Sequence, residues 1–409
     1  MSIQSILADL DSTRDAREAL YKHFHRNPEL SLQEYRTADR IEAELAAYGV
    51  EEVLRIGKTG VVAILRNGDG PVVAMRGDTD GLPMAERSGV DYAAEGVTQV
   101  DEASGQAIPV AHTCGHDFHI VCLLGATQAL HDHRDDWSGT FVAVFQPGEE
   151  NAAGAKAMVA AGIVDKLPRP DVYLGQHVLG SLPGGAVGIR SGPLFSAAAS
   201  IEITLQGKGS HGSMPNLGVD PIVLGAAIVS RLQTIVSREV APRETAVVTV
   251  GSFHAGTKSN IIPDSAVLQL NTRAFDKDVE KHLHEAIERI VHAECEAARS
   301  PKRPEFRYYD QYPLTSNHEE PTVRVRAAFD GYFGDDSVDM SPVPASEDFS
   351  VIPDAFGCPY TYWGLGGFED WKNAPGNHSP FFAPDIHPTL DRGTEAIVVA
   401  ASPWLIGSK

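Results

Sequence analysis

Apolar residues recur at helical spacing near the start of the chain. Between residues 12 and 48, one helical face carries Leu20, Phe24, Ile41 and Leu45. An Asn-Pro pair at residues 27–28 interrupts this pattern, and a proline does not continue a helix. We therefore expect two helices, one before and one after this pair.

Beyond residue 60, short apolar runs alternate with stretches of helical periodicity. We expect strands at residues 61–65, 72–75, 140–145 and 171–174, and helices at about 117–131 and 153–161. Apolar strands interleaved with helices are typical of an α/β sheet that is covered on both faces. The pattern therefore predicts an α/β fold with a mixed, mainly parallel sheet flanked by helices.

The pattern changes near residue 193. From there we expect a strand at 200–206, a glycine-rich loop at 207–213, a helix at 221–237, strands at 246–253 and 266–274, and a helix at 278–298. These elements make an α+β unit of the size of a small domain. Because α/β character returns after Pro304, we predict a main domain formed by residues 1–193 and 308–409, with an inserted domain at 194–307.

The composition is typical of a globular protein and limits the partners. The 409 residues are 43% hydrophobic and 22% charged, and the formal net charge is −21. This charge repels nucleic acid and anionic membranes, so we expect neither as a partner. The N-terminal segment is polar and acidic, and no apolar run is long enough to cross a bilayer. We therefore expect a cytoplasmic protein, in which the cysteines are ligands or core residues rather than disulfides.

Side chains that bind soft divalent metals occur after the apolar runs or in nearby loops. They are Cys114, His116, Glu149, Glu150, His177 and His378. Because ligands bind outside the carboxyl ends of strands in open α/β sheets, we expect these segments to meet in one cleft. Mixed thiolate, imidazole and carboxylate donors suit zinc or a neighbouring transition ion better than magnesium or calcium. Two adjacent glutamates allow one to bind metal while the other accepts a proton from water.

Each of these patterns also has a structural interpretation. The pair Cys114 and His116 is consistent with a turn around a buried thiol, and Glu149-Glu150 with a solvated acidic turn at a helix N-terminus. Asp78 and Asp80 either cap a turn or orient ligands such as His116. A single histidine such as His177 or His378 is more often a surface or core residue, and we interpret His112 and His119 as neighbours of the ligands or surface groups. The coincidence of several segments favours the metal site.

The inserted domain contains further candidates. His211 lies in the glycine-rich loop and is either a plain loop residue or a donor to the oxyanion of a tetrahedral intermediate. Asn260 and Arg273 are able to bind a substrate amide and carboxylate, because a guanidinium matches carboxylate geometry. The spacing of these three residues alone does not distinguish a structural role from a substrate-binding role.

Eight segments, in this order, resemble the amidohydrolase subfamily of hippurate hydrolase and the plant auxin-conjugate hydrolases. They are HRNPEL at 25–30, RGDTDGLP at 76–83, CGHD at 114–117, QPGEE at 146–150, GKGSHGS at 207–213, NIIP at 260–263, SEDF at 346–349 and HSP at 378–380. This subfamily is part of the aminoacylase and carboxypeptidase family of dinuclear metallohydrolases. The resemblance covers nearly the whole chain, which looks most like actinobacterial N-acyl-amino-acid aminoacylases.

The resemblance implies a catalytic domain interrupted by a lid domain that often dimerises. It implies two divalent ions per subunit, with zinc expected and manganese, cobalt or nickel as alternatives. The implied metal ligands are Cys114, His116, Glu150, His177 and His378, and the implied general base is Glu149. Asp78 and Asp80 occupy positions that in the wider family hold a metal-binding histidine and its orienting aspartate. The implied substrate contacts of the lid are His211, Asn260 and Arg273, with the histidine reaching across a dimer in many relatives.

Phe118 replaces a common glycine after CGHD, and glycines at 77 and 81 replace usual alanines. We expect Phe118 to reshape the pocket wall. The expected activity is hydrolysis of an N-acyl amino acid to a carboxylic acid and a free amino acid. The alternatives are a dipeptidase or carboxypeptidase and, from another class, a non-catalytic metal-bound binding protein, against which the presence of both Glu149 and Glu150 argues.

Overall fold

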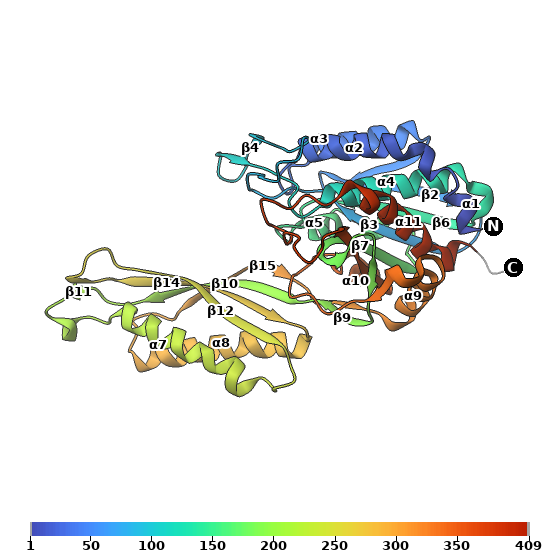
Figure 1. The fold of residues 1–409 in the computed structure, drawn as a ribbon. Coiled ribbons are helices and arrows are strands. Elements are labelled where there is room, and N and C mark those ends of the chain that lie inside the picture. Colours follow the sequence, from blue (N-terminus) through green and yellow to red (C-terminus); the bar gives the residue numbers. More distant parts are fainter. Residues whose placement is uncertain (1, 407–409) are drawn as a thin grey trace. The chain divides into compact units, whose positions relative to one another are not determined.

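The computed structural model describes residues 2–406 and divides into two compact units (Figure 1). The main unit comprises Met1–Gly192, Ser316–Ser341 and Asp348–Lys409, and the inserted unit comprises Pro193–Thr315 and Pro342–Glu347. Pro193 and residues 308–315 and 342–347, which were predicted to lie in the main domain, therefore belong to the inserted unit. Residues up to 312 belong there because β15 (Glu305–Tyr312) pairs with β10 (Ala197–Gln206) in the sheet of that unit. Within the second segment, Pro344 and Ser346 accept hydrogen bonds from Arg273 of the same unit.

The main unit is built on an eight-stranded sheet with the order β1-β2-β6-β3-β7-β18-β8-β17. Its strands are β1 (Glu52–Ile56), β2 (Gly60–Asn67), β3 (Val72–Asp78), β6 (Gly139–Gln146), β7 (Val172–Pro183), β8 (Val187–Ile189), β17 (Ser337–Asp339) and β18 (Tyr360–Phe368). The four central strands β6, β3, β7 and β18 are parallel to one another, whereas β1, β2 and β8 pair antiparallel with β2, β6 and β18. The predicted mixed, mainly parallel sheet is confirmed.

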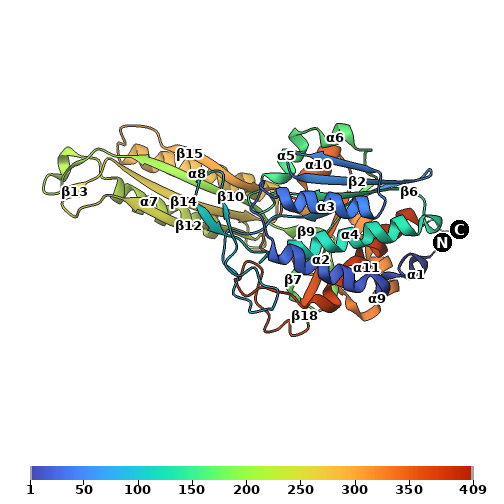
Figure 2. The ribbon, with the colours of Figure 1, turned by 90° about the horizontal axis from the view of Figure 1, so that it is seen from above.

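Helices cover the sheet of the main unit. One group packs around β3, β7 and β18 and consists of α2 (Arg14–Arg26), α3 (Tyr35–Ala47), α4 (His116–Asp132), α9 (Glu319–Phe333) and α11 (Ile386–Leu405). A second group, seen apart from the first in Figure 2, consists of α5 (Gly154–Ala160), α6 (Ile163–Lys166) and α10 (Val351–Phe356). The two helices expected around residues 27–28 are α2 and α3. No described helix is long and apolar enough to cross a membrane.

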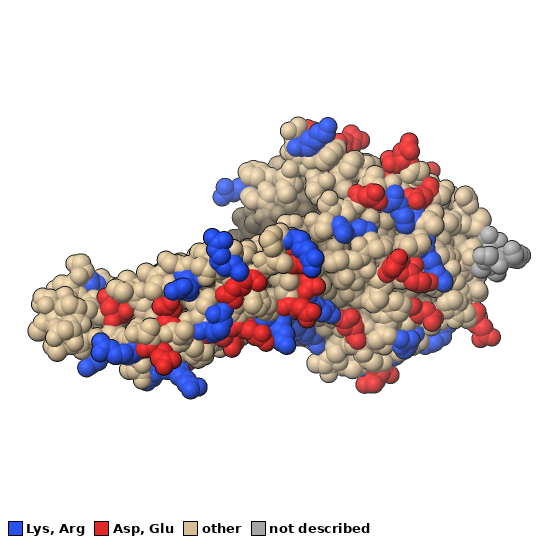
Figure 3. Space-filling view, turned by 90° about the horizontal axis from the view of Figure 1, so that it is seen from below, with Lys and Arg blue, Asp and Glu red and all other residues tan. Residues whose placement is uncertain are grey.

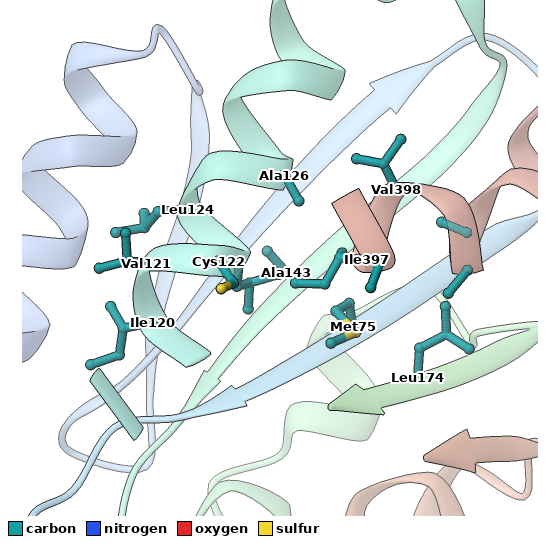
Figure 4. Close-up of a cluster of buried hydrophobic side chains, with 14 of the residues drawn as sticks. Met75, Ile120, Val121, Cys122, Leu124, Ala126, Ala143, Leu174, Ile397 and Val398 are labelled. Carbon is teal, nitrogen blue, oxygen red and sulfur yellow. The ribbon is translucent and has the colours of Figure 1, made fainter. Parts of the chain in front are cut away.

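The core of the main unit lies between the sheet and α4 and α11. Met75 of β3 and Leu174 of β7 lie near Cys122 of α4 and Ile397 of α11, and all four side chains are almost fully buried (Figure 4). Helix α4 is apolar around most of its circumference, because it packs between the sheet and other helices. Cys122, Cys295 and Cys358 are buried free thiols, as expected of core residues.

The inserted unit is a four-stranded sheet with two long helices. The sheet order is β12-β14-β10-β15, with β12 (Ala246–Ala255) and β14 (Ser265–Ala274), and all pairs are antiparallel. The helices are α7 (Pro221–Thr234) and α8 (Lys277–Ala297), and both pack on the sheet through a core that includes Ile203, Leu232 and Ile287. On the side shown in Figure 3, basic and acidic side chains of this unit are intermixed. Arg289 and Glu239 form one ion pair of this unit, at 2.6 Å.

Candidate metal centre

The carboxyl ends of the central strands place polar side chains at one level of the sheet. Gln146 at the end of β6 pairs with Asp78 at the end of β3, and Arg76 of β3 pairs with Gly175 of β7. Continuing this register by two residues places Asp78 level with His177. His177 was expected to follow its strand, but β7 continues to Pro183, and His177 lies within it, opposite Gly364 of β18. Its side chain still reaches the edge at which β3 and β6 end.

Helix α4 brings two further donors to this edge. Cys114 and His116 are both buried, and His116 is the first residue of α4. Gly115 between them has a φ of 86°, and a Cβ atom there would lie 2.3 Å from Cγ1 of Val178. A glycine is therefore required for this turn, which approaches β7 closely.

The donor atoms form two sets that share Cys114. In the first set, Sγ of Cys114 lies 3.5 Å from Nε2 of His177, and the donor atoms of Cys114, His116 and His177 all lie within 4.8 Å of one another. In the second set, Nε2 of His378 lies 3.3 Å from Oε2 of Glu150, and the donor atoms of Cys114, Glu150 and His378 meet the same limit. The residues of each set would hold a divalent ion, and Cys114 belongs to both sets.

Hydrogen bonds fix the orientation of two of the imidazoles. Nδ1 of His177 donates to the carbonyl oxygen of Val178 at 2.8 Å, and Nδ1 of His116 donates to Oδ1 of Asp80 at 3.2 Å. Each Nε2 is therefore directed toward the centre. Nε2 of His116 and Oε1 of Glu150 are buried without a hydrogen-bond partner, and they lie 3.8 Å apart. Buried polar atoms of this kind normally have a partner, and a cation between them fits this donor set.

The electrostatics of the centre favour bound positive charge. Burial opposes protonation of His378, but Cys114 and Glu150 outweigh it and raise the pKa of His378 to about 11. Burial also opposes protonation of His116, but the Asp78 carboxylate and Cys114 raise its pKa well above the usual range. Burial lowers the pKa of His177 well below that range. The negatively charged donors thus favour protonation of His378 and His116, at a place where a divalent cation would neutralise the same negative charges.

Glu149 lies beside this donor set. It is buried on the same turn as Glu150, and its carboxylate lies within 4.8 Å of the donor atoms of His116 and Glu150. The turn follows β6, as the sequence analysis predicted, so a buried strand ends in two carboxylates that face a common centre.

Asp78 has structural partners of its own. Its carboxylate bonds Nδ1 of His119 and the Arg76 guanidinium, and Arg76 also donates to Oε1 of Gln146 at 3.1 Å. Nε2 of His119 accepts the backbone N–H of Val178 at 2.9 Å, so that both of its nitrogens are engaged. Arg76 was not predicted as a site residue, and His119, which was interpreted as a neighbour of the ligands or a surface group, is a buried neighbour. The spacing of His119 three residues after His116 on one helix face was the available signal.

Phe118 does not line a pocket, contrary to expectation. It is fully buried in the core, and its ring centroid lies 4.2 Å from that of Tyr21 in α2. Two residues along a helix correspond to a rotation of about 200°, so Phe118 points away from the face that carries His116.

In the inserted unit, two of the three candidates lie together. His211 is in β11 (Ser210–His211), which pairs with β13 (Ile261–Ile262), and the N–H of Gly212 bonds the carbonyl oxygen of Asn260 at 2.8 Å. Arg273 lies near the opposite end of β14, eight residues beyond Ser265, which corresponds to roughly 26 Å of strand. Its guanidinium donates to Asn271, Pro344 and Ser346, all neutral acceptors.

A mainly parallel α/β sheet with a cluster of thiolate, imidazole and carboxylate donors at its carboxyl edge defines a metallohydrolase-like protein. Residues 74–401 match the model of peptidase family M20/M25/M40, and the chain belongs to this family. It is similar to an N-acetyl-L-cysteine deacetylase of Bacillus subtilis, with 33% identity over 95% of this chain and 86% of the relative. It is also similar to an N-acyl-L-amino acid amidohydrolase of Geobacillus stearothermophilus, with 36% identity over 79% of this chain and 84% of the relative.

A solved structure supports the fold and the kind of centre. The YxeP protein of Bacillus subtilis, a dinuclear metal-binding peptidase of family M20, aligns with a TM-score of 0.77 and 28% identity. The alignment covers 96% of this chain and 98% of that protein. The family resemblance and the fold predicted from the sequence are confirmed.

Proposed function

We propose that the protein is a metal-dependent amidohydrolase that cleaves N-acyl amino acids into a carboxylic acid and a free amino acid. The observation that carries this proposal is the convergence of Cys114, His116, Glu150, His177 and His378 beside Glu149. Family membership and the amidohydrolase relatives support the reaction class. We assign the five convergent residues as ligands of two divalent ions.

Glu149 is the proposed general base. The five ligands would hold divalent ions, which would supply polarisation of the scissile carbonyl and a more acidic water. Glu149 accepts a proton from the attacking water and returns it to the leaving nitrogen. Asp80 and Val178 hold the imidazoles of His116 and His177 in the orientation required of ligands. His211 supplies a donor for the developing oxyanion.

The inserted unit is the proposed lid. Its three candidate residues, His211, Asn260 and Arg273, contact two different substrate molecules in this proposal. His211 and Asn260 lie before the Ser265 end of β14, in or beside a separate two-stranded sheet, whereas Arg273 lies roughly 26 Å along β14 from Ser265, which is longer than an N-acyl amino acid. One subunit therefore does not apply both groups to the same substrate molecule. We assign Arg273 to the substrate carboxylate in one site, and His211 and Asn260 to the site of a partner subunit.

The proposed partner is a second copy of this chain, bound through the lid. Exposed apolar side chains occur on α7 and on the edge strand β12 of its sheet, namely Ile222, Val223, Val247 and Phe253. An edge strand with unpaired backbone groups and apolar neighbours is suited to pairing with another chain. Zinc as the metal and a cytoplasmic location remain predictions from the sequence.

The decisive experiment joins metal analysis to a substrate screen. Purified protein should contain close to two divalent ions per subunit, and a panel of N-acyl amino acids should be cleaved faster than dipeptides of matched side chains. Faster cleavage of dipeptides would identify a peptidase instead. If the protein binds metal but cleaves no member of the panel faster than Glu149→Gln does, it is a binding protein.

A further inference from the structure

Glu34 has a buried carboxyl group that bonds the turn carrying the proposed base. It precedes helix α3, and its side chain is 0% exposed. Oε1 accepts the backbone N–H of Gly148 at 2.8 Å and the backbone N–H of Leu32 at 2.8 Å. Oε2 accepts the hydroxyl of Thr59 at 2.7 Å. One carboxylate thus connects three segments that are distant in the sequence.

The contact with Gly148 has little freedom to shift. Gly148 has a φ of 58°, and Leu32, which faces it, has a φ of 60°. A Cβ atom at Gly148 would lie 2.9 Å from Cδ2 of Leu32. The carbonyl oxygen of Gly148 accepts the N–H groups of Ala153 and Gly154, which closes the turn from the other side. A left-handed leucine is uncommon, and the hydrogen bond to Glu34 helps to hold it.

The turn is anchored on both sides of Glu149. Gly148, on one side, donates to Glu34, and Glu150, on the other side, donates its backbone N–H to Oδ2 of Asp80 at 3.0 Å. Asp80 also orients His116, which places it within the predicted site. Glu34 has no such contact and lies outside the set of site residues proposed above.

We propose that Glu34 is a positioning residue for the reaction, which fixes the backbone that carries Glu149 by accepting the N–H of Gly148. This inference rests on the proposed role of Glu149. A base displaced by about 1 Å loses on the order of 100-fold in rate. Because the length of the Glu34 side chain sets its reach to Gly148, this length matters more than the charge of Glu34. Two conservative variants separate these properties. Glu34→Asp keeps the carboxylate but withdraws it from Gly148, whereas Glu34→Gln keeps an acceptor at the same reach.

The test measures kcat, KM, metal content and thermal stability of the full-length metal-loaded enzyme. We expect Glu34→Asp to lower kcat ten- to 100-fold with metal content and KM near wild type, and Glu34→Gln to retain kcat within a few-fold. Glu29 provides the matched control. It is 3% exposed in the same segment and accepts the backbone N–H of Thr37 at 2.7 Å, away from the turn. Glu29→Asp should lower stability while leaving kcat unchanged.

The proposal is overturned if Glu34→Asp keeps the wild-type kcat, if Glu29→Asp loses as much as Glu34→Asp, or if Glu34→Gln is as slow as Glu34→Asp. Should Glu34→Asp not fold, Glu34→Gln decides: a kcat more than ten-fold below wild type, with metal content near wild type, would overturn the proposal. Glu149→Gln separates the two levels of inference. If that variant is active, the role of Glu149 fails; if it is inactive and Glu34→Asp is fully active, only the role of Glu34 fails.

Discussion

Oδ1 of Asp80 lies 3.2 Å from Nδ1 of His116, and Oδ2 of the same carboxylate accepts the backbone N–H of Glu150. One aspartate therefore orients two proposed ligands. Loss of such a partner typically weakens metal binding by ten- to 100-fold. We expect Asp80→Ala to show a decrease of this size in competition with a chromogenic zinc chelator.

The control for Asp80 is Asp171, at the opposite end of the same strands. Its carboxylate accepts the N–H of Val72 at 2.8 Å, so it also bonds a backbone but lies away from the centre. Asp171→Ala should keep the wild-type metal affinity. A similar loss in both variants would mean that Asp80 acts through general stability.

Substitutions of the two adjacent glutamates should have different effects on metal content. Glu150 contributes an oxygen that faces His378 and His116, whereas Glu149 is the proposed base. Glu149→Gln should reduce kcat by on the order of 1,000-fold or more, and its metal content should stay near that of wild type. Glu150→Gln should lower metal occupancy. Equal metal loss in the two variants would refute this division of roles.

The fold and the centre were predictable where local patterns reflect the tertiary structure. Buried parallel strands appear as continuous apolar runs, so the polar residues after β3 and β6 marked the site. Strand β18 has no charged side chains, and its central place in the sheet had no sequence signal. The end of β7 was misplaced because Gln176 and His177 are polar residues inside a buried strand.

The errors at the site have a common physical cause. A motif gives the identity of a residue, but the direction of its side chain depends on the helix or strand that carries it. Phe118 was expected at the pocket wall because it adjoins CGHD, yet the helix turns it toward Tyr21. Glu34 and Arg76 were missed because their importance lies in contacts with backbone and side chains of distant segments.

A buried histidine should make stability depend on pH. Burial opposes protonation of His25, but hydrogen bonds to Asp117 at 2.6 Å and Glu86 at 2.9 Å outweigh it and raise the pKa of His25 from 6.5 to about 9. Because the pKa is higher in the folded state, this contribution is fully present below pH 6.5 and is lost as the pH rises through 9. The difference in unfolding free energy between wild type and His25→Gln should shrink by on the order of 3 kcal/mol across this range.

Urea unfolding of metal-stripped protein, followed by tryptophan fluorescence, measures this difference. All four tryptophans lie in the main unit with His25, so the signal reports on the correct unit. His254→Gln, an exposed position in the inserted unit, should leave the pH dependence unchanged. A constant difference between wild type and His25→Gln from pH 6.5 to 9.5 would contradict the prediction.

Arg273 should recognise the free carboxylate of the substrate. Its guanidinium bonds only neutral oxygens in the described chain, and burial lowers its pKa, so a substrate carboxylate would supply the missing negative partner. Converting this carboxylate to a carboxamide should cost about 1.5–3 kcal/mol, or roughly ten- to 100-fold in kcat/KM. Arg273→Ala should lose a similar factor with the acid and little with the amide.

The matched control for Arg273 is Arg307, on the edge strand of the same sheet, which pairs with Glu202. Arg307→Ala should discriminate between acid and amide as strongly as wild type. If wild type cleaves both substrates equally well, or if Arg273→Ala penalises both alike, Arg273 has a structural role.

Complementation between two inactive variants tests whether His211 serves a neighbouring subunit. His211→Ala lacks the proposed oxyanion donor, and Glu149→Gln lacks the proposed base. If the donor acts across a dimer, a hybrid of the two variants contains one site with both groups and one site with neither. Equal mixing after dissociation makes half of the dimers hybrid, so about a quarter of the wild-type activity should return.

The hybrid fraction is measured by native mass spectrometry of differently tagged subunits, and mixing each variant with itself is the control. Hybrid dimers without activity would show that His211 acts within its own chain or has no part in the reaction. The first of these outcomes would conflict with the separation of His211 from Arg273 along the lid sheet, and would require the two residues to contact different substrates in turn.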